Sequence, residues 1–200
     1  MRKRGKIVVL SAASGVGKST VLSAIRPKMP QLVYSISATT RSPRGNEKNG
    51  IDYFFMSKDD FLAKIDKNGF VEWAQVHGNY YGTPRDFIEK NLNDGKIIVM
   101  DIDVQGKTTL DKQYSKDIVV GIFIEAPSFE ELENRLRKRA TDSEKDIKIR
   151  LENAKKEKEV AVSHGNYDYF IVNENLNEAI NKIFGILSII NKEIREDDVE

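Results

Sequence analysis

The sequence lacks several features that define other classes of protein. It has 200 residues with no cysteine and two histidines. Without cysteine there are no disulfides, zinc–thiolate sites or cysteine nucleophiles, and this composition is typical of a reducing compartment. We therefore expect a cytoplasmic protein. No metal-ligand pattern surrounds His77 or His164, so we interpret both as structural or surface residues.

A long apolar segment and a large net charge are also missing. The basic start of the chain is followed by a single apolar stretch, Ile7 to Leu10, which is too short for a signal peptide or a membrane span. Lys and Arg total 32 against 31 for Asp and Glu, a formal net charge of +1. No overall field attracts nucleic acid or a membrane surface, so we expect neither as a partner, and anions must be bound by local clusters.

Short apolar runs alternate with helical patterns along most of the chain. The pattern predicts strands at 6–10, 32–36, 96–101, 118–124 and 169–172. Helices are expected at 18–25, 104–114, 128–138 and 175–194. Such alternation predicts an α/β fold with a parallel sheet flanked by helices.

Two regions interrupt this alternation. Short strands at 51–56, 70–76 and 80–81, with a helical segment between the first two, predict a small α+β lobe inserted at 37–92. Thr83 is expected to cap a helix that has Pro84 in its first position. A charged segment with a capping motif at Ser143 predicts a helical lid outside the core at 134–159. The core domain would then comprise 1–36, 93–133 and 160–200.

The segment SAASGVGKST, residues 11–20, resembles a phosphate-binding loop of the pattern G-x-x-x-x-G-K-[ST]. It follows an expected strand and opens an expected helix, the context that such a loop requires. Backbone N–H groups would surround the phosphates, Lys18 would reach the β- and γ-phosphate oxygens, and Ser19 would hold Mg²⁺. The expected ATP-binding residues in this segment are Ala12, Ala13, Ser14, Gly15, Val16, Gly17, Lys18, Ser19 and Thr20.

Ala12 stands where this pattern has its first glycine. If the backbone there needs a positive φ, alanine costs on the order of 1–2 kcal/mol. If φ is negative, the substitution costs almost nothing. The sequence leaves both alternatives open.

Charged residues near two other strand ends are candidates for the same site. Asp101 and Asp103 follow an apolar run, and the carboxyl ends of parallel strands form the binding edge of an open α/β sheet. These acids would serve Mg²⁺ or a nucleotide, and Asp103 is also placed to cap a helix. Arg41 and Arg44 lie in a loop after another strand, and guanidinium groups suit a phosphate monoester.

Three further segments carry a specific resemblance. The strings SATTRSPRGNEKNGIDYFF (37–55), GFVEWAQVHGNYYGTPR (69–85) and VMDIDVQG (99–106) follow the phosphate loop in the order found in guanylate kinases. The match spans about residues 6 to 175, and its specificity comes from four ordered motifs. The chain therefore resembles a guanylate kinase, a P-loop enzyme of purine nucleotide metabolism that transfers the γ-phosphoryl group of ATP to GMP, and to dGMP by expectation.

The resemblance implies a GMP site in the inserted lobe. The acceptor phosphate would be held by Arg41, Arg44, Tyr53 and Tyr81. The base would be read by Ser37, Glu72 and Thr83. Guanine offers N1–H and its 2-amino group to a carboxylate and accepts at O6 from hydroxyls, whereas adenine reverses this pattern.

The resemblance also assigns roles to the two acids and to residues around ATP. Asp101 is expected near the guanine amino group, and Asp103 near Mg²⁺ or the arginines. The lid arginines that close over ATP would be Arg135, Arg139 and Arg150. Ala140 replaces a family glycine after the lid arginine, and Asn173 is expected near the adenine of ATP.

The sequence also bears on three alternative functions. A switch GTPase is excluded because the tetrads at 181–184 and 191–194 lack the aspartate of N-K-x-D. A guanylate-kinase-like interaction module would bind a phosphorylated partner, and Ala12 is the feature that favours it. Lys18, Ser19 and the lid arginines favour the enzyme. A kinase for another nucleoside monophosphate would prefer AMP or a pyrimidine monophosphate over GMP.

Overall fold

Five parallel strands form the main sheet of the protein, in the order β2-β7-β1-β8-β9. The computed structural model describes residues 4–76, 78–138, 143–163 and 166–196. The strands of this sheet are β1 (Lys6–Ala12), β2 (Val33–Tyr34), β7 (Ile97–Asp101), β8 (Val119–Glu125) and β9 (Tyr169–Val172). The predicted parallel α/β sheet is therefore confirmed, with strand ends within two residues of the predicted ones.

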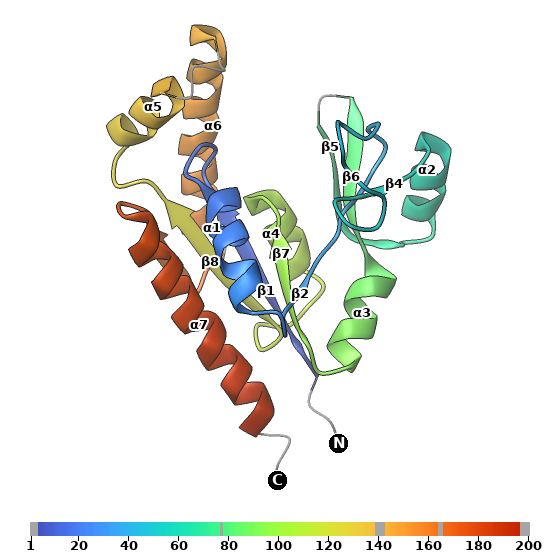
Figure 1. Cartoon of the computed structure of the whole chain (residues 1–200). Helices are drawn as coiled ribbons and strands as arrows, with labels where there is room; N and C mark the ends of the chain where they lie inside the picture. Colours follow the sequence, from blue (N-terminus) through green and yellow to red (C-terminus); the bar gives the residue numbers. More distant parts are fainter. Residues whose placement is uncertain (1–3, 77, 139–142, 164–165, 197–200) are drawn as a thin grey trace.

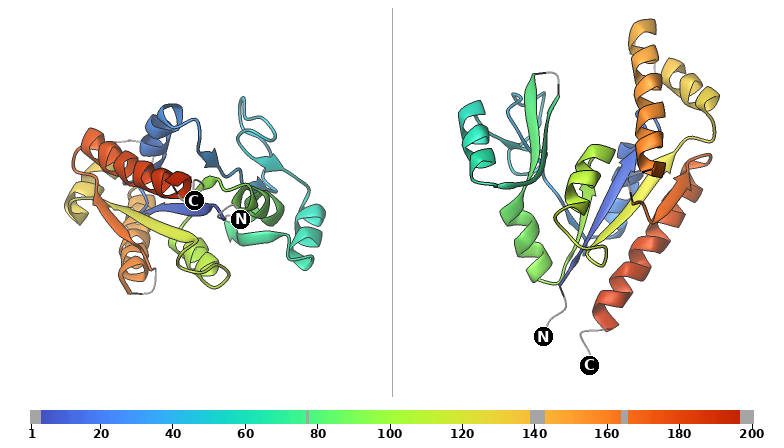
Figure 2. Two further views of the ribbon diagram at one scale, coloured as in Figure 1. Left: turned by 90° about the horizontal axis from the view of Figure 1, so that it is seen from below. Right: turned by 180° about the vertical axis from the view of Figure 1, so that it is seen from behind.

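Helices cover both faces of this sheet, as Figures 1 and 2 show. Alternate residues of β1 divide between the faces, so that Ile7 and Val9 belong to one core cluster and Val8 and Leu10 to the other. The first cluster includes residues of α3 (Arg85–Asn93) and α4 (Val104–Asp111). The second includes residues of α1 (Lys18–Ile25), which continues into the short helix η1 (Arg26–Lys28), and of α7 (Leu176–Glu196). Burial on both faces explains the continuous apolar runs in the sequence.

The inserted segment forms a second, four-stranded sheet in the order β4-β3-β6-β5. Its elements are β3 (Ala38–Thr39), β4 (Phe54–Phe55), α2 (Lys58–Asp66), β5 (Phe70–Val76) and β6 (Asn79–Pro84). Phe61 of α2 stacks on Phe70 of β5 with ring centroids 4.3 Å apart, and with Ala38 they form the small core of this lobe. The lobe stands beside the main sheet in Figure 1.

The start of α3 differs from the sequence prediction. Thr83 lies in β6, and Pro84 is the residue that precedes the first helical residue, Arg85. The predicted cap at Thr83 was wrong because strand pairing extends through Pro84, and the Arg85 backbone N–H then donates to the Gly69 carbonyl (2.9 Å). Buried residues of α3 belong to a core cluster of the main sheet, although the predicted lobe, 37–92, includes nearly all of this helix.

Helices α5 (Phe129–Lys138) and α6 (Glu144–Ser163) extend past the carboxyl edge of the main sheet (Figure 1). The backbone N–H of Asp146 donates to the Ser143 hydroxyl (3.2 Å), which confirms the predicted capping motif. The expectation that this charged segment lies outside the core was wrong in part, because each helix also has an apolar side. Leu136, Ile147 and Ala154 of the predicted segment 134–159 belong to the main core, as do Leu132 and Ala161 of the same two helices.

Helix α7 packs along the main sheet, as its helical spacing predicts. Ile183 and Leu187 are fully or almost fully buried, but Leu176 and Phe184 are 38% and 36% exposed. The apolar stripe of the helix is therefore wider than the face it buries. The Asn175 side-chain oxygen caps the helix by accepting from the backbone of Asn177 (2.9 Å). None of the described helices is long and apolar enough to cross a membrane.

Candidate active site

The phosphate loop joins β1 to α1 at the carboxyl edge of the main sheet. Gly15 and Gly17 have φ angles of 93° and 102°, which side chains other than glycine rarely adopt. A Cβ atom on Gly15 would lie 2.7 Å from the Leu136 side chain of α5. The loop glycines therefore provide both the backbone shape and the space in which α5 packs. Ser19 and Thr20 are exposed on the first turn of α1.

Ala12 belongs to the end of β1 rather than to the turn. It pairs in register with Ile124 of β8. Among the described residues, the non-glycine residues with positive φ are Asn68 and Asn166, so Ala12 is not in the left-handed region. Its methyl group packs in the main core. The second of the two alternatives holds, and the missing glycine does not strain the backbone.

The phosphate loop is also held by Asn173, the residue that follows β9. The buried Asn173 side-chain amide donates to the Val16 carbonyl (2.8 Å), and the Asn173 carbonyl accepts from Arg135 (2.9 Å). Arg135 also donates to Glu131 (2.9 Å) one turn earlier in α5. Asn173, predicted beside adenine, thus directs its side chain at the phosphate loop. Its contacts connect the loop to the lid helix α5.

A pocket of about 320 Å³ lies over the phosphate loop. It is lined by residues 12–19 together with Asp101, Asp103 and Glu157. Lys18 forms an ion pair with Asp101 and also donates to the Ile102 carbonyl (3.4 Å). Asp103 caps α4, because one carboxylate oxygen accepts from the backbone of Gln105 (3.0 Å) and Gly106 (2.8 Å). Capping and the predicted place at the binding edge therefore coexist for Asp103.

A second pocket of about 250 Å³ lies between the lobe and the main sheet. Of the residues predicted to bind GMP, it is lined by Ser37, Tyr53, Glu72, Tyr81 and Asp101. Asp101 and Asp103 line both pockets. The two pockets are therefore adjacent, with these two carboxylates where they meet.

Glu72 and Thr83 are paired across neighbouring strands of the lobe. The Thr83 hydroxyl donates to a Glu72 carboxylate oxygen (2.5 Å), and Thr83 is completely buried. Burial raises the pKa of Glu72, and the Thr83 hydrogen bond opposes that rise. The one hydroxyl hydrogen of Thr83 is donated to Glu72 in this arrangement, rather than to a base.

The two lobe arginines have different surroundings. Arg41 is held by Glu47 (2.9 Å) and the Ser42 carbonyl (2.8 Å), and its guanidinium lies 5.3 Å from the Tyr53 ring centre. The hydrogen bond that Arg41 donates to the Glu47 carboxylate raises the pKa of Arg41 further above its usual range. Arg44 is exposed, and its backbone N–H donates to Glu47 (2.7 Å). Glu47 therefore orders the loop and leaves the Arg44 side chain at the surface.

The structure describes two of the three arginines predicted to close over ATP. Arg135 lies on α5 and contacts the carbonyl of Asn173, and Arg150 is a partly buried residue of α6. Arg139 and Ala140 lie outside the described residues. The predicted role of Arg139 therefore stays a prediction.

Sequence reasoning missed two carboxylates in this region. Glu47 holds Arg41 and Arg44, and its position three residues after Arg44 was a signal that a local hydrogen bond was within reach. Glu157 accepts from the Ser14 backbone N–H in the phosphate loop (3.1 Å). Glu157 lies in a charged helix 143 positions away from Ser14 in the chain, and no sequence pattern marks it.

Comparisons with known proteins agree with this geometry. A protein-family model described as guanylate kinase matches residues 4–189. The chain is 40% identical to a guanylate kinase of Thermotoga maritima, over 92% of this chain and 86% of the relative. It is 46% identical to one of Bartonella henselae, over 92% of this chain and 81% of the relative.

A solved structure is similar over nearly the whole chain. The crystal structure of guanylate kinase from Anaplasma phagocytophilum is 36% identical in sequence and superimposes with a TM-score of 0.68. The match covers 94% of this chain and 87% of that one. The likeness therefore includes the main sheet, the lobe and the lid helices together.

Proposed function

The chain belongs to the guanylate kinase family and is an ATP:GMP phosphotransferase, and we propose that its two adjacent pockets hold the two substrates of this reaction. The observation that supports this assignment is the position of Asp101 and Asp103, which line both pockets. ATP would occupy the pocket over the phosphate loop, and GMP the pocket of the lobe. The transferring phosphoryl group would then pass between Lys18 and the lobe arginines.

The donor side would bind phosphate mainly through backbone groups. The glycines set the loop so that N–H groups and the N-terminus of α1 are available to the phosphate oxygens. Lys18 would exchange its ion pair with Asp101 for contacts to the β- and γ-phosphates. Arg135, Arg139 and Arg150 would neutralise charge on the transferring group. Asn173 would act by holding Val16 and Arg135 in place.

The oxygen ligands around the phosphate loop fit Mg²⁺. The described residues contain no group of three or more carboxylate, histidine or cysteine side chains that could hold a metal ion. Mg²⁺ in phosphoryl-transfer sites is commonly held by one or two carboxylates together with substrate phosphates and water. Ser19 and Asp103 would hold the ion here. When bound, Mg²⁺ neutralises phosphate charge during transfer.

On the acceptor side, Glu72 would select the base. Its carboxylate would accept from N1–H and the 2-amino group of guanine, and Ser37 would donate to O6. Thr83 would act through Glu72, because it donates its hydroxyl hydrogen there (2.5 Å) and fixes the direction of the carboxylate. Asp101 would lie near the guanine amino group. Adenine would leave these polar groups without partners, which is a strong basis for selection.

The phosphate of GMP would be held by Arg41, Arg44, Tyr53 and Tyr81. Arg41 and the two tyrosines are already assembled, with the tyrosine ring centroids 6.1 Å apart. The phosphate would recruit Arg44 from the surface. No covalent enzyme intermediate is needed, because phosphoryl transfer is accelerated mainly by alignment and charge neutralisation. Closure of the lid over ATP would exclude water and suppress hydrolysis.

The experiment is an ADP-release assay with Mg-ATP and one acceptor at a time: GMP, AMP, CMP or UMP. We expect turnover with GMP alone. In Glu72→Gln, the amide would oppose the guanine 2-amino group with its own donor, so kcat/KM for GMP should fall by roughly a thousandfold or more. Equal turnover with AMP would contradict the proposed base selection.

Glu89→Gln is the matched control for this assay. Glu89 also accepts a side-chain hydroxyl, that of Tyr114 (2.7 Å), but lines neither of the two pockets. Its replacement should leave kcat/KM for GMP within about twofold of the wild type. A large loss in both variants would show that a carboxylate–hydroxyl pair matters for the stability of the fold rather than for base selection.

A further inference from the structure

A carboxylate of helix α6 accepts a hydrogen bond from a backbone N–H group of the phosphate loop. Glu157 lies near the end of α6 and accepts from the Ser14 backbone N–H at 3.1 Å. It is half-buried, and it lines the donor pocket together with the loop residues 12–19. Backbone N–H groups in such loops bind anions. In this arrangement one of them has an anion of the protein itself as its partner.

The surroundings of Glu157 favour its charged form only in part. Among the described residues that line the donor pocket, Lys18 is the one cation, and it already pairs with Asp101. Asp103 is a further carboxylate of the same pocket. Burial and the Asp103 charge raise the pKa of Glu157, against the opposing effects of the Ser14 hydrogen bond and the Lys18 charge. Its contact with the loop is therefore one that a stronger anion could displace.

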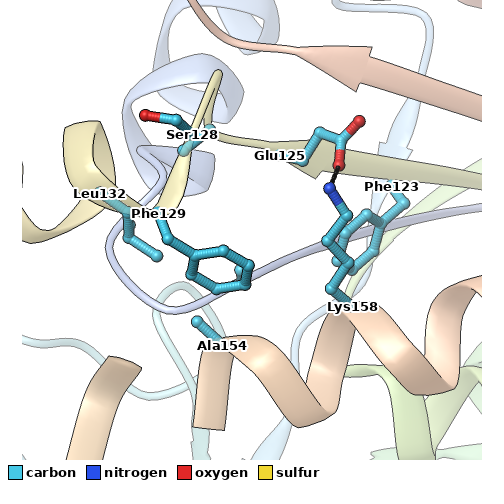
Figure 3. A pocket seen from close by; sticks show the side chains of 9 residues that line it. Phe123, Glu125, Ser128, Phe129, Leu132, Ala154 and Lys158 are labelled. Atoms are coloured by element: carbon cyan, nitrogen blue, oxygen red, sulfur yellow. Dashed lines mark ion pairs between the residues drawn. The ribbon is translucent and has the colours of Figure 1, made fainter. Parts of the chain in front are cut away.

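The next residue ties the same helix to the main sheet. Lys158 forms an ion pair with Glu125 at the end of β8 (2.7 Å), beside a small cavity of about 50 Å³ (Figure 3). Phe129 and Leu132 of α5 line this cavity with Ala154 of α6. Helix α6 is thus anchored at two consecutive residues, one to the loop and one to the sheet. Release of the Glu157 contact would leave the helix held by Lys158 and by Ala154 and Ala161, which pack in the main core.

Helix α6 connects Glu157 to Arg150, which is proposed to act on the transferring phosphoryl group. Arg150 lies seven residues before Glu157 on α6, which is two turns or about 10 Å along the axis. Residues this far apart on one continuous helix move together. A change at Glu157 therefore reaches Arg150 without any change in the helix between them.

We propose that Glu157 is a positioning residue that takes the place of a phosphate on the empty loop, and that a triphosphate displaces it and thereby frees α6 for closure. The inference rests on the proposed binding of ATP to this loop. Displacement links phosphate binding to lid position, and such a link is reciprocal. The contact therefore lowers the affinity of the loop for phosphate while it holds the lid in place.

The test measures binding of inorganic tripolyphosphate by calorimetry, without Mg²⁺, in wild type and Glu157→Gln. Glutamine keeps the shape of the side chain and loses the charge. We expect binding to become about tenfold tighter, and the KM for ATP to fall without a rise in kcat. Unchanged or weaker binding would overturn the proposal, because Glu157 would then support the loop or play no part in phosphate binding.

Two further measurements make the test specific. Glu159→Gln removes a charge from an exposed residue of the same helix and should leave tripolyphosphate affinity within about twofold. Amide hydrogen exchange in α6 should rise when tripolyphosphate binds to the wild type and be already raised in free Glu157→Gln. Exchange that does not respond to tripolyphosphate would overturn the link between the loop and the lid.

Failure of this inference is distinct from failure of the proposed substrate sites. If the wild type releases ADP with GMP and Glu157→Gln shows ordinary tripolyphosphate affinity, the sites stand and the role of Glu157 is wrong. If tripolyphosphate does not bind to the wild type, the assignment of ATP to the loop fails first.

Discussion

The proposed donor and acceptor pockets are formed by different kinds of chemical group. On the donor side, the proposed phosphate ligands are largely backbone N–H groups, and the loop that carries them has Ala13 and Val16 buried in the main core. On the acceptor side, the proposed ligands are side chains of the inserted lobe, such as Glu72 on a strand and Arg41 in a loop. Donor geometry is therefore set by chain conformation, and acceptor geometry by pairs of side chains.

The cores beneath the two sides differ as well. The main sheet has large buried clusters on both faces, whereas the fully buried core of the lobe consists of Ala38, Phe61 and Phe70. A small core supports less stability than a large one. We infer that the lobe can unfold or change without loss of the phosphate loop. The phosphate loop packs in the main core, so it cannot unfold separately from the main sheet.

Phe61→Ala should have the largest effect on this comparison. Phe61 is completely buried and stacks on Phe70, and truncation of a buried phenylalanine costs about 3–5 kcal/mol. The lobe core is too small to absorb that loss, so we expect raised hydrogen exchange in β5 and β6 and loss of GMP turnover. Binding of tripolyphosphate to the donor loop should remain within about threefold of the wild type.

Phe123→Ala is the matched control for this prediction. Phe123 is also completely buried, but it lies in β8 and belongs to the main core. Its truncation should lower the stability of the whole chain and weaken tripolyphosphate binding at elevated temperature. If Phe61→Ala instead raises exchange in β1 as much as in β5, the two regions unfold as one unit and the comparison fails.

Arg44→Met should have the next largest effect. The side chain is exposed in the absence of substrate, so its loss should leave the melting temperature unchanged. A lost charged hydrogen bond to the GMP phosphate should reduce kcat/KM for GMP by roughly 10- to 100-fold. Tripolyphosphate binding should be unaffected. Kinetics measured beside a melting curve separate these effects, and unchanged kinetics would remove Arg44 from the acceptor site.

Arg41→Met gives the contrasting result within the same loop. Arg41 is held by Glu47 and lies over Tyr53 before any substrate binds. Its loss should therefore reduce turnover and also raise hydrogen exchange in the loop. Equal exchange in the two variants would show that Glu47 does not preorganise the acceptor loop.

Features set by local pattern were predictable from the sequence. The strands of the main sheet are continuous apolar runs, and both phosphate-loop glycines occur where the backbone has positive φ. The helix cap at Ser143 also follows from its neighbours alone. Where strand pairing competed with a local signal, pairing prevailed: Thr83 and Pro84 read as a helix start but continue β6.

Contacts between distant segments were not predictable in this way. Asn173 was expected beside adenine, yet its side chain holds the carbonyl of Val16, 157 positions earlier. The hydroxyl of Thr83 turns to Glu72 because the strands β5 and β6 pair. A motif identifies which residues share a site. It does not determine which of them contact the ligand and which hold their neighbours.

Ala12→Gly should have the smallest effect, and it tests the donor side directly. Because Ala12 ends β1 and is not in the left-handed region, glycine relieves no strain there. Loss of the buried methyl group and the added freedom of the chain should cost about 1 kcal/mol of stability. Turnover measured by ADP release should stay within about twofold of the wild type. A rate several-fold above wild type would instead show that alanine restrains the loop in the catalytic cycle, and that donor geometry depends on a side chain after all.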